Sequence, residues 1–362
     1  MPILGGMAEM NGQEPLRLKR VAQLADLRDE WDGLALGAGH PFATYEWNSI
    51  WWRYYGGDRE LFTFACRDDD GRLVAILPLY IARSRPRIAR LLGYADLGSP
   101  LCAPDDRSRV AAALQALTGR RARGADGCSL ILLERLPGEQ GWSELLGATV
   151  LRTETDPVLR IAGRSWDEFL ASKSSSFRKQ ARYQERRLAR EHDLEIRLCE
   201  DPADFDAEFD VLTALHDRRW GDVSTGVLAG ERGEMQREIA RAAMERGWLR
   251  LWIERVDGEP AAAYYGIRFA GSEFFYQSGR DPRFDRLSVG AVLLAHVVRD
   301  ACEAGVGTFR FLAGDESYKL RLADGDFEPE TVLVGSGLTG ALGRAGVRAV
   351  RAMPESLRAR VS

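Results

Sequence analysis

Four ionisable side chains follow a hydrophobic run in residues 309–325, FRFLAGDESYKLRLADG. They are Asp315, Glu316, Tyr318 and Lys319. A carboxylate can accept a proton, a tyrosine can donate one, and a lysine can stabilise developing negative charge. A plain turn needs Gly, Asn or Asp, but it needs neither a tyrosine nor a lysine. The segment is therefore a candidate reacting site. The alternative is a capped helix, with Asp315 at the N-cap and Lys319 paired with Glu316 across one turn.

A second candidate site lies in residues 277–294, QSGRDPRFDRLSVGAVLL, where an aromatic strand ends and a helix begins near Gly290. The first N–H groups of a helix are unpaired and partly positive, and a glycine lets a phosphate approach them. Ser288 could cap this helix, and three arginines add positive charge. The pattern fits either a pyrophosphate cradle or an ordinary strand-to-helix connection. The candidate cofactor-binding residues are Gln277, Ser278, Arg286, Ser288, Val289 and Gly290.

Predicted helices supply further candidates. His216 in ALHDRRW could serve as an alternative base, with Arg219 and Trp220 lining an acceptor cleft, although a lone histidine on a helix is often structural. The segment 172–190, which includes Arg178, has seven basic residues against Glu185 alone, a net charge of +6. This basic helix could face a nucleotide-linked or lipid-pyrophosphate acceptor or an anionic polymer. The alternative is a solvated basic face.

The elements that must position these residues occur twice in the same order: strand, Asp-Gly turn, strand, strand, loop, helix, strand. The periodicity predicts them at 61–67, 73–82, 87–97, 107–120 and 128–136, and again at 248–256, 261–270, 273–279, 291–305 and 308–314. Helices are expected before the strands of each half, at 18–35, 43–56, 165–192 and 204–220. The order indicates a domain-scale duplication, or the general likeness of mixed α/β sequences.

We therefore expect an α/β (α+β) protein with two lobes, each a mixed, mostly antiparallel sheet flanked by helices. The expected lobes are 15–155 and 156–335, because Pro157 and Gly163 punctuate the sequence between them. The segment 337–353 of the remaining tail, 336–362, has a small apolar stripe beside arginines. It could lie on an anionic membrane as a basic amphipathic helix or dock against its own domain.

Composition argues against several other classes of protein. A chain of 362 residues can bury a substantial core, and its net charge of -4 gives no global affinity for nucleic acid. The five cysteines are scattered, which argues against a disulfide framework or a zinc ribbon, and the four histidines have no metal-binding spacing. No secretory signal or apolar run of about 18 residues is present. We expect a protein that is cytoplasmic, either free or peripheral to the inner membrane, and that uses no metal and binds no DNA.

The segment 275–323 resembles the C-terminal half of the CelD/BcsL family of GNAT-type acetyltransferases, which are relatives of the FemAB aminoacyltransferases. The residues that carry this resemblance are Tyr276, Asp281-Pro282, Ser288, Gly290, Gly314-Asp315 and Tyr318-Lys319. The segments 171–191, 41–47 and 70–80 also resemble the family, so the resemblance spans about 15–335. Arg280 departs from it, because the family often has a hydrophobic or aromatic residue there.

The resemblance implies two GNAT-like lobes, of which the second holds acetyl-coenzyme A or another acyl-coenzyme A and the first is degenerate. It also implies transfer to an amine or hydroxyl, usually in cell-surface polysaccharide synthesis. The expected acceptor is an amino sugar or a sugar hydroxyl of a polysaccharide precursor, either a small molecule or linked to a lipid or nucleotide. Backbone near Gln277 and Ser278 would contact the thioester carbonyl. Tyr318 would be the acid and Asp315 the base or amine-orienting group.

Two rivals to this interpretation stay open. One is a FemAB-like aminoacyltransferase that uses charged tRNA, although the long helical hairpin of some of those enzymes has no counterpart in this sequence. The other is a catalytically inactive binding protein that recruits polysaccharide machinery through its basic helix and tail. Replacement of Tyr318 and Lys319 distinguishes an enzyme from a scaffold, because it should abolish turnover only in the enzyme.

Overall fold

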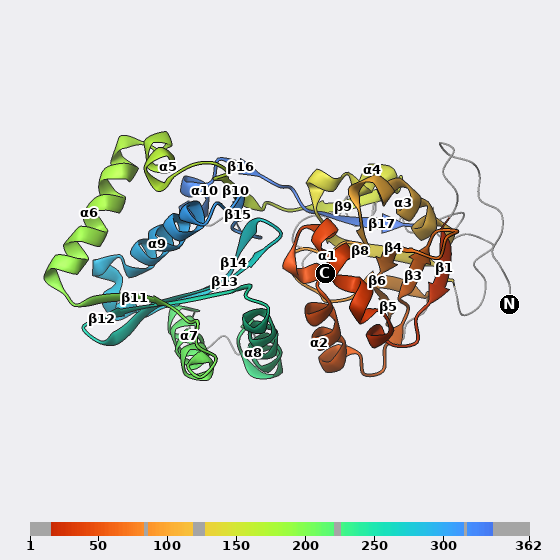
Figure 1. The fold of residues 1–362 in the computed structure, drawn as a ribbon, viewed down its shortest axis with the longest axis horizontal. Helices are drawn as coiled ribbons and strands as arrows, with labels where there is room; N and C mark the ends of the chain where they lie inside the picture. Colours follow the sequence, from red (N-terminus) through yellow and green to blue (C-terminus); the bar gives the residue numbers. More distant parts are fainter. Residues whose placement is uncertain (1–15, 83–85, 119–126, 221–225, 315–316, 336–362) are drawn as a thin grey trace, which may run out of the picture. The chain divides into compact units, whose positions relative to one another are not determined.

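The computed structural model describes residues 16–82, 86–118, 127–220, 226–314 and 317–335. The chain forms two compact units, Met1–Glu154 with Phe327–Ser362, and Thr155–Asp326 (Figure 1). The first unit is thus built from two separate stretches of sequence, and the second from one. The tail 336–362, where an amphipathic helix is expected, lies outside the described residues.

The first unit contains two sheets. One has the strand order β1-β3-β4-β7, and the other has the order β2-β5-β6-β8-β17-β9. The strands are β1 (Arg17–Arg20), β2 (Glu60–Leu61), β3 (Phe64–Arg67), β4 (Leu73–Leu77), β5 (Leu79–Ile81), β6 (Ile88–Leu91), β7 (Leu101–Cys102), β8 (Leu130–Leu136), β9 (Thr149–Thr153) and β17 (Glu330–Val334). The helices are α1 (Arg28–Ala38), α2 (Tyr45–Tyr55), α3 (Arg107–Ala116) and α4 (Trp142–Leu145).

The second unit is one seven-stranded sheet with the order β11-β12-β13-β14-β15-β10-β16. Its strands are β10 (Pro157–Arg160), β11 (Leu194–Leu198), β12 (Leu249–Val256), β13 (Glu259–Phe269), β14 (Ser272–Arg280), β15 (Thr308–Arg310) and β16 (Gly325–Asp326). Its helices are α5 (Trp166–Ser172), α6 (Ser175–Glu191), α7 (Phe205–Trp220), α8 (Gly230–Glu245), α9 (Val289–Glu303) and α10 (Ser317–Leu322). In Figure 1, α5, α6 and α9 lie on one side of this sheet, and α7 and α8 lie on the other.

Each unit contains one parallel pair of strands joined through a helix. In the first unit, β6 pairs with β8 and α3 lies between them in sequence. In the second unit, β14 pairs with β15 and α9 lies between them. A parallel pair needs a crossover connection, usually a helix, whereas the neighbouring antiparallel pairs do not. The two units therefore share the strand–helix–strand core that the repeated sequence order predicts, and the mixed α/β fold with two lobes is confirmed.

The apolar pattern of α9 explains its place against the sheet. Its sequence, VGAVLLAHVVRDACE, buries Val289, Val292, Leu293, Val297 and Val298 among other residues. These positions recur at helical spacing, so one face of the helix is apolar. That face packs in a core with aromatic side chains of the sheet that include Tyr264, Phe275 and Phe309. The packing of this apolar face against the sheet holds the start of α9 in place, after the loop that follows β14.

The structure differs from the expected elements at three points. Residues 18–20, expected to be helical, belong to β1, because Arg17–Arg20 pairs antiparallel with Phe64–Arg67 of β3. The helices α4 and α8 were not expected, and neither were the short strands β7, β9, β10, β11, β16 and β17; the strand expected at 73–82 is instead β4 and β5, which belong to different sheets. The third difference concerns residues 327–335, assigned by sequence to the second lobe. Here β17 pairs with β8 and β9 of the first unit.

Candidate active site in the second unit

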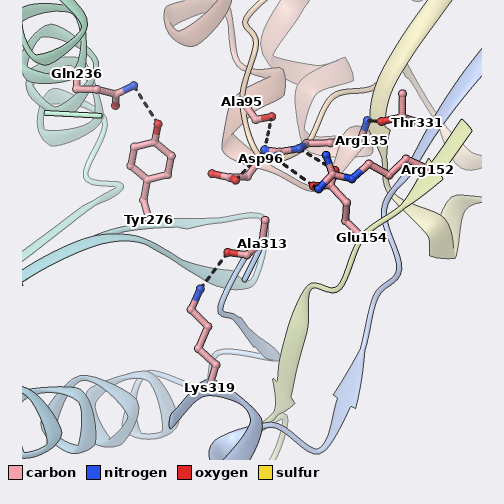
Figure 2. Close-up of polar contacts among 10 residues, drawn as sticks. All are labelled: Ala95, Asp96, Arg135, Arg152, Glu154, Gln236, Tyr276, Ala313, Lys319 and Thr331. Atoms are coloured by element: carbon pink, nitrogen blue, oxygen red, sulfur yellow. Dashed lines mark hydrogen bonds and ion pairs between the residues drawn. The ribbon is translucent and has the colours of Figure 1, made fainter. Parts of the chain in front are cut away.

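The strand β14 carries an irregularity at its centre. Tyr265 of β13 pairs with Gln277, but the next residue, Gly266, pairs with Phe275, so Tyr276 is an extra residue in β14. Such a β-bulge leaves the extra residue outside the regular ladder, increases the local twist and is common beside active sites. The Tyr276 hydroxyl accepts a hydrogen bond of 3.0 Å from Gln236 Nε2 of α8 (Figure 2). This bond fixes the bulged side chain on the side of the sheet that α8 covers.

Beyond the bulge, β14 separates from its parallel neighbour. The pairing between β14 and β15 covers only Ser272–Phe274 and Thr308–Arg310. After β15, the chain leaves the sheet through a turn that contains Leu312, whose φ is 59°, and Gly314, whose φ is 134°. Within the described residues, Phe275–Arg280 therefore has a ladder partner only on the β13 side. An open strand edge offers backbone N–H and C=O groups to a bound chain or ligand.

Gly279 brings α7 onto this part of β14. A Cβ atom at position 279 would lie 2.3 Å from the backbone nitrogen of His216 and 2.4 Å from the carbonyl carbon of Leu215. Only a residue without a side chain permits so close an approach, and a glycine inside a strand is the sequence signal for it. The contact places the C-terminal turns of α7 beside the open segment of β14.

Two predicted site residues from α7 meet two from β14 at this contact. The side chain of Gln277 lies close enough to His216 to act on the pKa of its imidazole. Arg219 Nη1 donates a hydrogen bond of 2.5 Å to Ser278 Oγ. His216 is buried, with 6% of its surface exposed, while Arg219 is half-buried. The structure therefore brings together four residues singled out in the sequence, which come from segments about 60 positions apart.

Burial lowers the pKa of His216 from its ordinary value of 6.5, and the nearby Asp217 carboxylate and Gln277 side chain oppose this shift only in part. Desolvation disfavours the charged imidazolium, so the ring is neutral at neutral pH. A neutral imidazole can accept a proton, which an imidazolium cannot. Among the described candidates, His216 is thus the one with the protonation state that a general base needs.

Asp281 joins α7 to the loop that follows β14. Its carboxylate accepts hydrogen bonds from Arg218 Nη1 at 2.6 Å and from Arg283 Nε and the Arg283 backbone N–H at 2.9 Å. These bonds hold the pKa of Asp281 below its usual range. The side chain is 2% exposed. In the sequence, Asp281 stands out only as part of the Asp281-Pro282 motif. Its position before a proline, where an Asp commonly caps the following turn, was the available signal.

The start of α9 fits the expected phosphate-binding role in one respect and departs from it in another. Ser288 occupies the N-cap position with φ 60° but makes no side-chain capping bond, contrary to the expectation that it caps the helix. At Gly290, an added Cβ would meet only Arg280 Cδ, at 3.7 Å. The protein's own packing therefore does not require a glycine there. The space above this first turn is open to a ligand, which is the use predicted for Gly290.

Of the three loop arginines, two pair with neighbouring carboxylates. Arg280 pairs with Asp285, and Arg283 pairs with Asp281. Arg286 is exposed and makes no hydrogen bond or ion pair within the described part of the chain. It lines a groove of about 260 Å³ together with Leu287 and Ser288. The opposite wall is α6, through Tyr183, Gln184, Arg187, Leu188 and Glu191. This groove is where the structure could hold a phosphate group.

The other candidates have different surroundings. Lys319 lies in α10 with 6% of its surface exposed, and its Nζ donates a hydrogen bond of 3.0 Å to the carbonyl oxygen of Ala313 (Figure 2). The backbone of Tyr318 belongs to α10, but its side chain and that of Trp220 lie outside what the structure describes, as does the whole of Asp315. Arg178 donates hydrogen bonds to the carbonyl oxygens of Ala171 and Lys173.

The described residues contain no group of three or more His, Cys, Asp or Glu side chains that could hold a metal ion. No described helix is both long enough and apolar enough to cross a membrane. All five cysteines are buried and unpaired.

Comparison with known proteins agrees with this geometry. Residues 175–320 match the model of the acetyltransferase (GNAT) domain. The match begins at α6 and ends within α10, so it contains β14, α9 and every candidate residue described above. This stretch of the second unit is therefore similar to a GNAT acetyltransferase domain, which indicates acyltransferase activity in general terms. No curated protein matches the chain.

Solved structures with a similar fold cover nearly the whole chain. FemX matches 91% of this chain and 99% of its own, with a TM-score of 0.62 and 11% identity. The C-terminal domain of an Agrobacterium fabrum protein named as a lysylphosphatidylglycerol synthetase matches 89% of this chain and 95% of its own, with a TM-score of 0.55 and 13% identity. L-PGS from Bacillus licheniformis matches 83% and 91%, with a TM-score of 0.50 and 13% identity. At these identities the likeness concerns the fold.

Proposed function

We propose that the second unit transfers an acyl group, the acetyl group in the first instance, from acyl-coenzyme A to an amine or hydroxyl. The acceptor in this proposal is an amino sugar or another precursor of a cell-envelope polysaccharide, as in the CelD/BcsL group that the sequence resembles. The observation that carries the proposal is the position of β14. Its bulged, one-sided segment lies against His216 at Gln277 and leads, through Asp281, to the start of α9.

The reaction breaks the C–S bond of a thioester and forms a C–N or C–O bond to the acceptor. One proton leaves the acceptor, and one is needed by the departing thiolate. A backbone N–H of the open β14 segment near Gln277 would stabilise the negative charge on the carbonyl oxygen. His216 would take the acceptor proton, because burial keeps its imidazole neutral. Tyr318 remains the proposed acid and Asp315 the group that orients the acceptor.

The residues at the α9 start would bind the pyrophosphate of the donor. Arg286 contributes a positive charge without an ion pair in the described chain, and Gly290 leaves the first turn of α9 open. Acyl-coenzyme A, when bound, would supply the activated thioester. The protein's own contribution is to hold the phosphate groups, to orient the carbonyl and to exclude water from the reacting atoms.

Calorimetric titration with acetyl-coenzyme A tests this proposal. The wild-type protein should bind with a dissociation constant in the micromolar range, which corresponds to about -8 kcal/mol. The double variant Arg286→Glu, Gly290→Asp should lose binding, because it places two carboxylates beside the phosphates. The variant Arg72→Glu, which reverses the charge of an exposed arginine of the first unit, is the control for the charge reversal at Arg286. Absence of binding by the folded wild-type protein would refute the proposed donor.

A second candidate function is aminoacyl transfer. The support for it is the whole-chain similarity to FemX and to the protein named as a lysylphosphatidylglycerol synthetase, a name that specifies a lysyl group and a phospholipid. Aminoacyl-tRNA would then replace acyl-coenzyme A as donor. A parallel binding measurement with charged tRNA and acetyl-coenzyme A separates the two functions, since each predicts tight binding of only one donor.

A further inference from the structure

The exposed face of α6 is strongly basic. A hollow of about 610 Å³ lies along it, lined by Ser175, Arg178, Lys179, Arg182, Tyr183, Arg186, Arg187 and Arg190. These residues recur at helical spacing on one side of α6. The other side of the helix packs against α9, through Leu188 and through Arg299, which pairs with Glu185. We call the lined side the arginine face.

The arginine face keeps most of its positive charge. Two carboxylates pair with three of its six cations: Asp167 pairs with Arg182, while Glu191 pairs with both Arg187 and Arg190. The face therefore retains a net charge of about +4. Lys179 and Arg186 are exposed and make no ion pair within the described residues. Exposed side chains of like charge repel one another, so this arrangement contributes little to the stability of the fold. It is suited to binding an anionic ligand.

The arginine face is continuous with the groove at the start of α9. Tyr183 and Arg187 line both hollows. A ligand that places one phosphate group beside Arg286 and Ser288 can therefore place its neighbouring groups on the arginine face. Tyr183 lies at this junction with 56% of its surface exposed, unusually high for a large aromatic side chain in this protein. An exposed aromatic ring between cations is a stacking surface for a nucleobase.

We infer that the arginine face binds the adenosine 3′-phosphate end of coenzyme A, with the adenine against Tyr183. The inference rests on the proposed acyl-coenzyme A donor. It adds a second contact surface for that donor, on α6. The 3′-phosphate of coenzyme A carries close to two negative charges at neutral pH. The net positive charge of the arginine face is more than enough to offset them. Arginine suits the site, because its guanidinium binds a phosphate through two parallel hydrogen bonds.

The experiment compares coenzyme A with 3′-dephospho-coenzyme A by calorimetric titration at one fixed salt concentration. The wild-type protein should bind dephospho-coenzyme A roughly tenfold more weakly, the loss expected for one or two charge-assisted hydrogen bonds. The double variant Lys179→Gln, Arg186→Gln should bind coenzyme A about tenfold more weakly and should no longer distinguish the two ligands. It breaks no ion pair of the described chain, and glutamine favours helix, so α6 should stay folded.

The control variant Arg72→Gln should retain full discrimination. Equal affinity of the wild-type protein for the two coenzymes would overturn the inference and leave the acyl-coenzyme A donor intact. Discrimination that persists in the double variant would also overturn it, because the 3′-phosphate would then bind elsewhere. Failure of both coenzymes to bind would instead refute the proposed function. Binding to anionic vesicles or RNA that is lost in the double variant, without coenzyme discrimination, would assign the face to a macromolecule.

Discussion

At the scale of single residues, the environment of His216 sets the expected pH dependence of the reaction. Burial lowers its pKa from 6.5, so the imidazole is protonated only below that pH. The rate of acyl transfer should therefore rise with pH through a pKa below 6.5 and then level off. We expect His216→Gln to reduce the turnover number about 10²- to 10⁴-fold and to remove this acidic limb. Steady-state rates from pH 5 to pH 8 provide the measurement.

A structural role for His216 would give a different result. In that case His216→Gln would lower the melting temperature but leave the acidic limb in the rates of the surviving folded protein. The variant His192→Gln is a suitable control, because His192 lies outside the site, where it pairs with Asp257 on the surface. Its pH profile should match that of the wild-type protein.

Glu254 on β12 leads to a second prediction at this scale. Its side chain is fully buried, and burial raises its pKa from 4.5 to about 8. Between these two values the folded state holds a proton that the unfolded state has released. The free energy of unfolding should therefore fall as pH rises from 5 to 8, by up to about 1.4 kcal/mol per pH unit from this group. Above the pKa of about 8 that Glu254 has in the folded state, the stability contributed by its bound proton is lost completely.

The variant Glu254→Gln isolates this effect. Its free energy of unfolding, measured by urea titration at pH 5, 6.5 and 8, should decline less with pH than that of the wild-type protein. Glu195→Gln, at an exposed position on neighbouring β11, should reproduce the wild-type slope. Parallel wild-type and Glu254→Gln curves would show that Glu254 titrates normally in the folded state.

At the scale of elements, the crossing of α7 over β14 is set by the absence of a side chain at position 279. Gly279→Ala places a methyl group against the α7 backbone, which cannot move as a flexible side chain would. We expect a loss of about 1–3 kcal/mol of stability, as for an overpacked core. Acyl transfer should fall more than coenzyme A binding, because His216 moves while the start of α9 does not. Urea unfolding and steady-state kinetics measure the two effects.

Gly33 in α1 offers the matched control for this substitution. A Cβ atom there meets nothing within 4 Å. Gly33→Ala should therefore leave activity unchanged and raise the free energy of unfolding by up to about 1 kcal/mol, the helix propensity difference. If both alanine variants behaved alike, the close approach at Gly279 would not be a constraint on the fold.

The elements that bury a periodic apolar face could be predicted from the sequence. The strands β12, β13 and β14 and the helix α9 lie within a few residues of their expected ranges. β1 was mistaken for helix, because its four residues alternate in exposure over too short a run to exceed the helical pattern around it. The cluster of His216, Gln277, Ser278 and Arg219 was predicted only as separate residues. Their proximity depends on the contact between α7 and Gly279, which no local pattern encodes.

At the scale of the whole molecule, the return of the chain to the first unit determines how each unit can fold. β17 lies between β8 and β9 and pairs with both. A polar cluster supports this junction: the Arg135 backbone N–H donates to Thr331 Oγ1, while its side chain pairs with Asp96 and Glu154 (Figure 2). Residues 1–154 alone lack this central strand. The sequence assigned it to the second lobe because strand pairing between distant segments leaves no local signal.

Separate expression of the two units tests this organisation. The fragment 155–326 is continuous and contains all seven strands of its sheet, so we expect a single cooperative unfolding transition. The fragment 1–154 should be unstable or aggregate, because without β17 both β8 and β9 expose an unpaired edge and β9 loses its place in the sheet.

A fusion that joins residues 327–335 to this fragment through a flexible linker should restore a cooperative transition. Circular dichroism during thermal unfolding measures all three proteins. Cooperative unfolding of 1–154 alone would mean that β17 is dispensable, whereas failure of the fusion would mean that the first unit needs the second in order to fold.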